Sequence, residues 1–299
     1  MKVLNFGSLN IDKVYKVVDF VQPGETILSL DYQEFCGGKG LNQSIALSRA
    51  GTMVYHAGAI GEDGMRLKSA LEEAGVKTTF LQVLSEPSGH AVIEVDGSGQ
   101  NRIIVTQGTN GRITKNYVDE VLGHFEKGDI LLLQNEISNI SHIMENAKAK
   151  GMIIALNPSP TNKALYEYPL NLVDIFILNE KEGMALTGTP ECCQEKILDC
   201  LEKRYPEAVF VLTLGAEGAC YRGRGEHCYQ AAFSIDAVDT TAAGDTFCGY
   251  FMAEYVNGKR PTEALLTATK ASAIAVGRKG ASPSIPTMEE VEEFPEIIQ

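Results

Sequence analysis

Short apolar segments of strand length alternate with amphipathic helical segments along most of this 299-residue chain, and this pattern limits the fold more than any other feature. The apolar segments include residues 129–133, 153–156, 174–178 and 208–214. Strands that are connected through helices run parallel, and a parallel sheet is buried on both faces. We therefore expect an α/β fold of three layers (αβα), in which helices cover both faces of a mainly parallel, Rossmann-like sheet.

Two segments interrupt this alternation with strand-like sequence. Residues from about 11 to 36 and from about 88 to 110 each contain two short β-type stretches around a turn signal. The turn signals are Gln22-Pro23-Gly24-Glu25 and Asp96-Gly97-Ser98-Gly99. Both segments could leave the same edge of the sheet and pair into a small lid. Because the chain shows no repeat and no linker, we expect one α/β domain over residues 1–299 with a non-contiguous β lid.

Composition excludes several classes of function. The formal net charge is −13, from 26 Lys and Arg against 39 Asp and Glu, and such a surface repels nucleic acids. No apolar run approaches the roughly 18 residues of a membrane span. The apolar run at the first residues ends too early for a signal peptide. Seven cysteines form no Cys-x-x-Cys pair. We expect a cytoplasmic protein without zinc that binds neither nucleic acid nor membrane.

The stretch from Asp239 to Phe247 lies where an extended segment gives way to a helix. Ala243 and Gly244 are small, so a ligand can approach the backbone, and the free N–H groups of a first helical turn attract anions. Asp245 would place a carboxylate beside that anion site, which is what phosphoryl transfer to a hydroxyl needs. The stretch alone also fits a simple helix start with an acidic residue that suits the helix dipole.

Polar clusters follow several of the predicted strands. Ligands of open α/β sheets collect beyond the carboxyl ends of the strands, so five clusters on one edge favour a site over five unrelated turns. The loop Gly37-Gly38-Lys39-Gly40 fits either a ligand-binding loop or a tight turn before a helix. The clusters are Asn10 and Asp12, Asn135 and Glu136, Asn157 to Pro160, Asn179 to Glu182, and Thr213 to Gly218.

Common nucleotide-binding signatures do not occur. The sequence contains no Gly-x4-Gly-Lys-Ser/Thr, no strict Gly-x-Gly-x-x-Gly, and neither the His-Arg-Asp nor the Asp-Phe-Gly motif. A P-loop enzyme, a Rossmann dehydrogenase and a protein kinase are therefore disfavoured.

Seven short motifs, in order from residue 3 to about 286, give the chain a resemblance to the PfkB carbohydrate kinase family. The motif around Asp245 is highly specific for this family, and the form of the glycine loop resembles that of the ribokinases within it. The resemblance therefore implies the ribokinase-like fold. The motifs are Asn10-x-Asp12, Pro23-Gly24-Glu25-Thr26, Gly37-Gly38-Lys39-Gly40-x-Asn42-Gln43, Asn157-Pro158-x-Pro160, Asn179-Glu180-x-Glu182, Thr213-Leu214-Gly215-x-x-Gly218 and Asp239-Thr240-x-Ala242-Ala243-Gly244-Asp245.

The resemblance also implies a role for individual residues. Sugar contacts are implied for Asn10, Asp12, Gly38, Lys39, Asn42, Glu136 and Asp245. Asp245 matches the catalytic base, and Ala243, Gly244 and the Asp245 amide match its anion hole. Nucleotide contacts are implied for Asn179, Thr213, Leu214, Gly215, Ala216, Glu217, Gly218, Gly244 and Thr269. Glu182 matches a carboxylate that holds Mg²⁺ through its waters, and K⁺ is implied as an activator beside Asp239, Thr241, Ala275, Arg278, Gly280 and Ser284.

The activity implied is transfer of the γ-phosphoryl group of ATP to a sugar hydroxymethyl group, with D-ribose as substrate and ribose 5-phosphate as product. The partners implied are therefore a small sugar and ATP, and exposed lid strands would pair in a homodimer. Departures from the family pattern at His90, Thr106, Leu41 and Thr269 leave the sugar and the nucleotide open. The alternatives are a kinase of fructose, another pentose or a nucleoside, and a catalytically silent sugar sensor.

Overall fold

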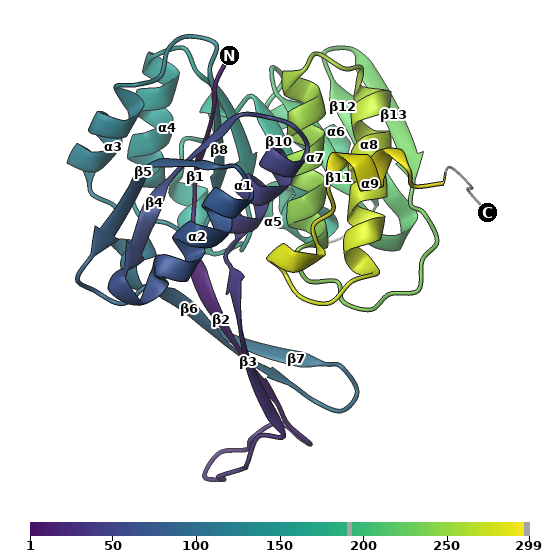
Figure 1. The fold of residues 1–299 in the computed structure, drawn as a ribbon. Helices are drawn as coiled ribbons and strands as arrows, with labels where there is room; N and C mark the ends of the chain where they lie inside the picture. The colour runs from purple at the N-terminus through teal and green to yellow at the C-terminus, as the bar shows by residue number, and fades with distance from the viewer. Residues whose placement is uncertain (190–192, 296–299) are drawn as a thin grey trace.

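Nine strands form one large sheet in the computed structural model, which describes residues 1–189 and 193–295 (Figure 1). The strand order is β13-β12-β11-β10-β9-β8-β1-β4-β5. The seven neighbouring strands from β11 to β5 in this order pair in parallel. Strands β12 and β13 continue the sheet beyond β11 as an antiparallel hairpin. The strands are β1 (Val3–Phe6), β4 (Val54–Gly61), β5 (Lys77–Leu84), β8 (Ile130–Gln134), β9 (Ile153–Asn157), β10 (Ile175–Asn179), β11 (Val209–Thr213), β12 (Gly218–Gly223) and β13 (Glu226–Ala231).

Helices cover both faces of this sheet and bury a separate apolar cluster against each one. The expected three-layer α/β fold is therefore confirmed. One face carries α1 (Lys39–Arg49), α2 (Met65–Glu73), α7 (Ala243–Val256), α8 (Pro261–Val276) and the short α9 (Met288–Glu292). The other face carries α3 (Lys115–Leu122), α4 (Ile140–Ala149), α5 (Glu180–Thr187) and α6 (Gln194–Arg204).

A second sheet of four strands projects from one end of the molecule as the predicted lid (Figure 1). Its order is β3-β2-β6-β7, and β2 and β6 pair in parallel although they are far apart in the sequence. Both predicted turns form, with hydrogen bonds from the Glu25 amide to the Gln22 carbonyl and from the Gly99 amide to the Asp96 carbonyl, each of 3.0 Å. The lid strands are β2 (Asn10–Lys16), β3 (Asp31–Gly37), β6 (Gly89–Val95) and β7 (Asn101–Thr106).

Helix α7 is buried on almost every side because it lies between α1 and α8. An apolar ridge runs along one side of it, with successive ring centroids of Phe247, Phe251 and Tyr255 6.3 Å apart. The opposite side of the helix is equally covered. A Cβ on Gly249 would lie 2.4 Å from the Cβ of Ala46, so glycine permits the close approach of α7 to α1.

None of the helices in the described part of the chain is long and apolar enough to cross a bilayer. The six cysteines that the structure describes are all free thiols.

Candidate active site

The five polar clusters lie together because the strands they follow are neighbours in the sheet. Strands β11, β10, β9, β8 and β1 are adjacent, and a cluster lies beyond the carboxyl end of each. The lid begins at the same edge, since β2 starts at Asn10, directly after β1. The structure therefore brings together at one edge of the sheet the residues that the sequence placed in separate motifs.

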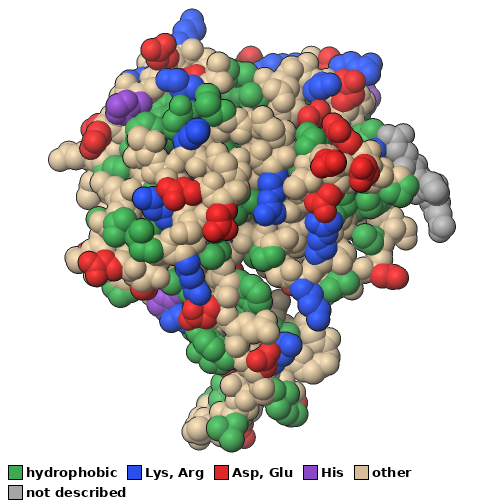
Figure 2. Space-filling model, in the orientation of Figure 1, with side chains coloured by type: hydrophobic (Ala, Val, Ile, Leu, Met, Phe, Trp, Pro, Cys, Tyr) green, Lys and Arg blue, Asp and Glu red, His purple; other side chains and the backbone are tan. Residues whose placement is uncertain are grey.

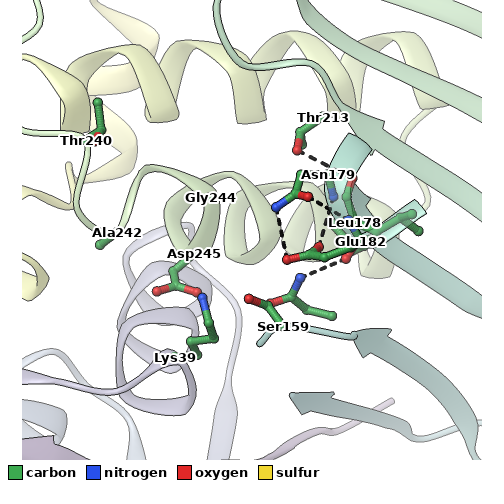
Figure 3. Close-up of a pocket in the computed structure, with 12 residues that line it drawn as sticks. Lys39, Ser159, Leu178, Asn179, Glu182, Thr213, Thr240, Ala242, Gly244 and Asp245 are labelled. Atoms are coloured by element: carbon green, nitrogen blue, oxygen red, sulfur yellow. Dashed lines mark hydrogen bonds between the residues drawn. The ribbon is translucent and has the colours of Figure 1, made fainter. Parts of the chain in front are cut away.

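Three cavities meet at this edge, and Thr240 lies in the wall of all three. A polar cavity is lined by Lys39, Glu182, Gly244 and Asp245, among others (Figure 3). An apolar cavity lies on the other side of Gly244, toward α8 and the segment after β13. The third is a cleft under the lid that is lined by Asp12. Thr240 thus lies where a sugar site, a phosphate site and a nucleoside site could join.

The glycines at the start of α1 allow close approach between parts of the chain itself. A Cβ on Gly40 would lie 2.4 Å from the Ser8 amide nitrogen, and one on Gly37 would lie 1.9 Å from a carboxylate oxygen of Asp12. Gly38 also has φ of 93°, which other residues rarely adopt. The loop therefore packs against the segment after β1, and this packing carries Lys39 into the polar cavity.

Asp245 lies in the first turn of α7, buried, with both carboxylate oxygens hydrogen-bonded. Asn42 Nδ2 donates to Oδ2 at 3.0 Å and Gln43 Nε2 donates to Oδ1 at 2.9 Å, both from α1. The side chain of Lys39 points toward the same carboxylate (Figure 3). These contacts fix the orientation of the carboxylate at the wall of the polar cavity.

The start of α7 leaves the N–H groups of Gly244 and Asp245 without a partner among the described residues, whereas the Ala243 N–H donates to the Thr240 carbonyl at 3.3 Å. Ala242 begins the helix in the left-handed conformation, with φ of 60°, and makes no capping hydrogen bond with its side chain. A Cβ on Gly244 would meet no other atom within 4 Å, so the backbone there faces open space. Free N–H groups at a helix start, in an open and polar cavity, are suited to an anion.

The charged groups of the site shift one another's pKa values. Burial alone would lower the pKa of Lys39, but the carboxylates of Asp245, Glu136 and Glu182 raise it above its ordinary value. Desolvation raises the pKa of Glu136, which accepts hydrogen bonds from the Ser8 hydroxyl and, at 3.1 Å, from the Lys39 amide. Lys39 is thus held as a cation among carboxylates.

Asp12 lies on lid strand β2 and lines the cleft under the lid, and its pKa is strongly raised. Desolvation, then the carboxylates of Glu136 and Asp245, raise this pKa to about 7, while the Arg66 guanidinium opposes the shift. Asn10 is buried nearby, and Asn110 Nδ2 donates to its Oδ1 at 2.8 Å. The sugar contacts implied for Asn10 and Asp12 therefore lie at the start of the same lid strand.

Asn179 and Glu182 form a reciprocal cap at the start of α5. The Asn179 amide nitrogen donates to Glu182 Oε2 at 2.9 Å, and the Glu182 amide nitrogen donates to Asn179 Oδ1 at 2.9 Å (Figure 3). Desolvation raises the pKa of Glu182, which is buried at the wall of the polar cavity. The cap holds the carboxylate of Glu182 in a fixed place.

Of the residues from Thr213 to Gly218, some line the apolar cavity and others do not. Thr213, Gly215, Ala216 and Gly218 line the apolar cavity, and Thr269 of α8 lies in the same wall with its buried hydroxyl unpaired among the described residues. Leu214 instead packs in the apolar core, and Glu217 does not line the cavity.

The residues implied for a monovalent cation join two loops beside α7. Asp239 Oδ1 accepts from the Thr241 amide at 2.8 Å, and Oδ2 accepts from the Gly280 amide at 3.0 Å. The side chain of Arg278 pairs with Glu290, so Arg278 could offer a cation only its backbone carbonyl. The Ala275 carbonyl accepts from the Arg278 amide, and the Ser284 hydroxyl donates to the Ala281 carbonyl. Both carboxylate oxygens of Asp239 are thus held by backbone amides of the two loops.

Mg²⁺ fits the polar cavity only as part of a nucleotide complex. Within residues 1–189 and 193–295, no group of three or more His, Cys, Asp or Glu side chains could hold a metal ion. Mg²⁺ in kinases binds the substrate phosphates, several waters and only one or two carboxylates, so Glu182 alone suffices for this mode.

Sequence reasoning missed several side chains that contact the implied site residues, among them Gln43 and Asn110. Gln43, in the quoted glycine motif but without a role assigned to it, donates to Asp245. Asn110 holds Asn10 from a position 100 residues away, and no local signal in the sequence indicates it.

Comparison with known proteins agrees with this geometry. The model of the pfkB family carbohydrate kinases matches residues 1–288. Ribokinase of Haemophilus influenzae is 35% identical over 295 residues and 96% of each chain, and deoxyribokinase of Salmonella typhi is 29% identical over 301 residues and 98% of each chain.

Solved structures are similar over the whole chain. Arabidopsis thaliana ribokinase complexed with ribose and ATP has a TM-score of 0.86 at 30% identity and covers 99% of both chains. Cryptococcus neoformans ribokinase in complex with ADP has a TM-score of 0.85 at 34% identity, over 98% of this chain and 99% of that one. The chain therefore belongs to the pfkB family of carbohydrate kinases and is an ATP-dependent phosphotransferase.

Proposed function

We propose that the enzyme transfers the γ-phosphoryl group of ATP to O5 of D-ribose, with Asp245 as the general base. The observation that carries this proposal is the place of Asp245, a buried carboxylate beside the free N–H groups at the start of α7. Asp245 accepts the proton of the O5 hydroxyl while that oxygen bonds to the γ-phosphorus and the bond to the ADP oxygen breaks. Ala243, Gly244 and the Asp245 amide stabilise the charge on the transferred group.

The sugar would lie between α1 and the lid. Asn10, Asp12, Lys39, Asn42 and Glu136 provide donors and acceptors for a small uncharged ring with several hydroxyls. Asn42 Oδ1 is buried without a partner among the described residues, which leaves an acceptor for a sugar hydroxyl. The backbone of Gly38 would contact the ring from the same loop. A lid that closes over the ring would exclude water as a competing acceptor.

The nucleotide would occupy the apolar and polar cavities together. We propose that the adenosine contacts Thr269 and the residues from Thr213 to Gly218 that line the apolar cavity. The phosphates would then pass Gly244 toward Asn179 and Asp245 in the polar cavity. Glu182 would hold Mg²⁺ through its waters, and when bound with ATP this ion neutralises charge on the phosphate oxygens.

A second candidate substrate is 2-deoxyribose, because one full-length relative is a deoxyribokinase. The site favours ribose, since a pocket built to hydrogen-bond hydroxyls is left with unpaired buried groups when a hydroxyl is missing. The experiment is incubation with ATP and D-ribose followed by ³¹P and ¹³C NMR of the product. A phosphate ester on C5 supports the proposal, and an ester on another carbon or no ester contradicts it.

We also propose that residues 1–299 act as one α/β domain in the cytoplasm and form a homodimer through the lid. Hydrophobic side chains are exposed over the projecting lid (Figure 2), and Leu28, Leu30 and Ile104 are 92%, 69% and 70% exposed. Apolar residues on open strands favour pairing with another strand. Analytical ultracentrifugation tests this, and a monomer mass at assay concentrations would contradict the dimer.

A further inference from the structure

A row of buried side-chain amides connects Asp245 to a backbone carbonyl in the first turn of α1. Gln134 Nε2 donates to Gln43 Oε1 at 2.7 Å and to Asn5 Oδ1 at 3.0 Å. Asn5 Nδ2 donates in turn to the Gly40 carbonyl at 2.8 Å. Gln43, Gln134 and Asn5, which we call the amide row, are at most 1% exposed. None of the roles assigned above uses these three residues.

Backbone carbonyls at both ends fix the direction of the amide row. A carbonyl only accepts, so the Gly40 carbonyl requires Asn5 to present its NH₂ group. Asn5 Oδ1 must then face Gln134, and Gln134 must present its NH₂ group to both neighbours, although its own Oε1 finds no partner among the described residues. Gln43 Oε1 is thereby turned toward Gln134, away from Asp245.

The contacts of Gln43 with Asn157 and Cys248 require the same orientation of the Gln43 amide. Asn157 Nδ2 donates to the Ile177 carbonyl at 2.9 Å, so Asn157 Oδ1 faces Gln43 Nε2 at 3.2 Å. Cys248 Sγ lies 3.6 Å from Gln43 Oε1 as a further donor. Gln43 therefore presents its NH₂ group to Asp245. The reverse orientation would place its oxygen against the oxygens of Asp245 and Asn157, and its NH₂ group against that of Gln134.

Gln43 has no means of touching a substrate. Its side chain is fully buried, and its NH₂ group is shared between Asp245 and Asn157 while its oxygen accepts from Gln134. An effect of Gln43 on the reaction must therefore pass through a neighbour, and among its hydrogen-bond partners only Asp245 has a proposed role in the reaction.

We propose that Gln43 is a positioning residue for Asp245 and that the amide row fixes the orientation of its side chain. The proposal rests on the assignment of Asp245 as the base. Asn42 holds Oδ2 and Gln43 holds Oδ1, so the carboxylate cannot rotate about its last bond without losing a hydrogen bond. A misplacement of about 1 Å in such a group can cost about 100-fold in rate.

The test uses Gln43→Met, which keeps the length of the side chain and removes its hydrogen bonds. We expect kcat to fall about 10- to 100-fold while KM for sugar and ATP changes by less than about threefold, because binding groups stay in place. Gln134→Met, which does not touch Asp245, should lower kcat in the same direction by less. Tyr117→Phe is the matched control, since it removes buried hydrogen bonds to Gly58 far from the cavity and should leave kcat unchanged.

A double-mutant cycle separates this proposal from the assignment of the base. In an Asp245→Asn background, Gln43→Met should cause no further fall in kcat if Gln43 acts only through Asp245. Native kcat in folded Gln43→Met, with Asp245→Asn inactive, overturns the positioning role and leaves the base intact. Native kcat in Asp245→Asn overturns the base itself. If Gln43→Met does not fold, Gln134→Met decides, and a native kcat in it contradicts the role of the amide row.

Discussion

Asn42 donates a 3.0 Å hydrogen bond from Nδ2 to Oδ2 of Asp245, while its own Oδ1 is buried and unpaired among the described residues. One side chain thus connects the proposed base to an acceptor for the sugar. A hydroxyl that filled this acceptor would lie close to the carboxylate that is to take a proton. The proposed sugar contact and the proposed proton transfer would therefore meet at one side chain in the first turn of α1.

The first prediction concerns Asp245→Asn, which keeps the volume of the side chain and removes its basicity. We expect kcat to fall by about 10²- to 10⁴-fold, the usual cost of losing a general base, with nearly unchanged binding of sugar and ATP. Steady-state kinetics and calorimetric titration measure the two effects. Asp119→Asn on the outer face of α3 is the control. A kcat within a few-fold of native would remove Asp245 from the base role.

The second prediction concerns the close approach of α1 and α7. In Gly249→Ala the new Cβ would lie 2.4 Å from the Cβ of Ala46, so the helices must separate. We expect a loss of about 1–3 kcal/mol in the free energy of unfolding, as for other overpacked cores. We also expect a lower kcat, because Asn42 and Gln43 would move away from Asp245. Denaturant unfolding measures the first, and Gly97→Ala, where the Cβ meets open space, is the control.

If the packing argument is wrong, Gly249→Ala will match Gly97→Ala in both stability and turnover.

The third prediction concerns pH and Asp12. Its pKa is raised to about 7 by desolvation first and then by Glu136 and Asp245, so the side chain is largely protonated below pH 7. A carboxylate accepts hydrogen bonds from sugar hydroxyls better than a carboxyl group, so KM for the sugar should fall as pH rises through 7. Kinetics of native enzyme and of Asp12→Asn on both sides of pH 7 measure this. A pH dependence of KM that survives in Asp12→Asn would assign it to another group.

The same shift has a consequence for stability. The folded protein holds a proton on Asp12 that the unfolded chain, with an ordinary pKa of 3.8, has already lost. The contribution of Asp12 to stability is therefore present below pH 3.8 and is lost as pH rises to about 7. Asp12→Asn should flatten this part of the profile of stability against pH.

The fourth prediction concerns potassium. A cation beside Asp239 would order the loop that precedes α7 and strengthen the positive field of the anion site without touching substrate. Replacement of K⁺ by Na⁺ at constant ionic strength should then lower kcat. Activity that is indifferent to the ion would mean that the segment from Arg278 to Ser284 is only a loop.

The sequence was sufficient for the layers of the fold and for the grouping of the polar clusters. Both follow from local patterns, because parallel strands must place their carboxyl ends at one edge. The sequence did not allow us to predict β5, β12, β13 and α8. Strand β5 is an edge strand with polar residues, and glycines interrupt the hairpin of β12 and β13. Helix α8 did carry a signal, Pro261 at its first position followed by Glu263.

The contacts within the site were harder to predict from the sequence than the residues that form it. Gln43 and Asp245 are 202 positions apart, and Asn110 and Asn10 are 100 apart. Such pairs depend on how α1, α7 and the lid pack, which periodicity does not show. The glycine loop illustrates the difference. The sequence left open a ligand-binding loop or a tight turn, and the structure packs Gly38 and Gly40 against the backbone after β1.

The most direct test of the central claim is a comparison of kcat/KM with ATP for D-ribose, 2-deoxyribose, fructose and adenosine, measured by coupled release of ADP. The account predicts the highest kcat/KM for D-ribose and a clearly lower value for 2-deoxyribose, because the site would be left with unpaired buried groups. A kcat/KM for adenosine, fructose or 2-deoxyribose that exceeds that of D-ribose by about tenfold, or about 1.4 kcal/mol of transition-state stabilisation, would contradict the assignment of the sugar.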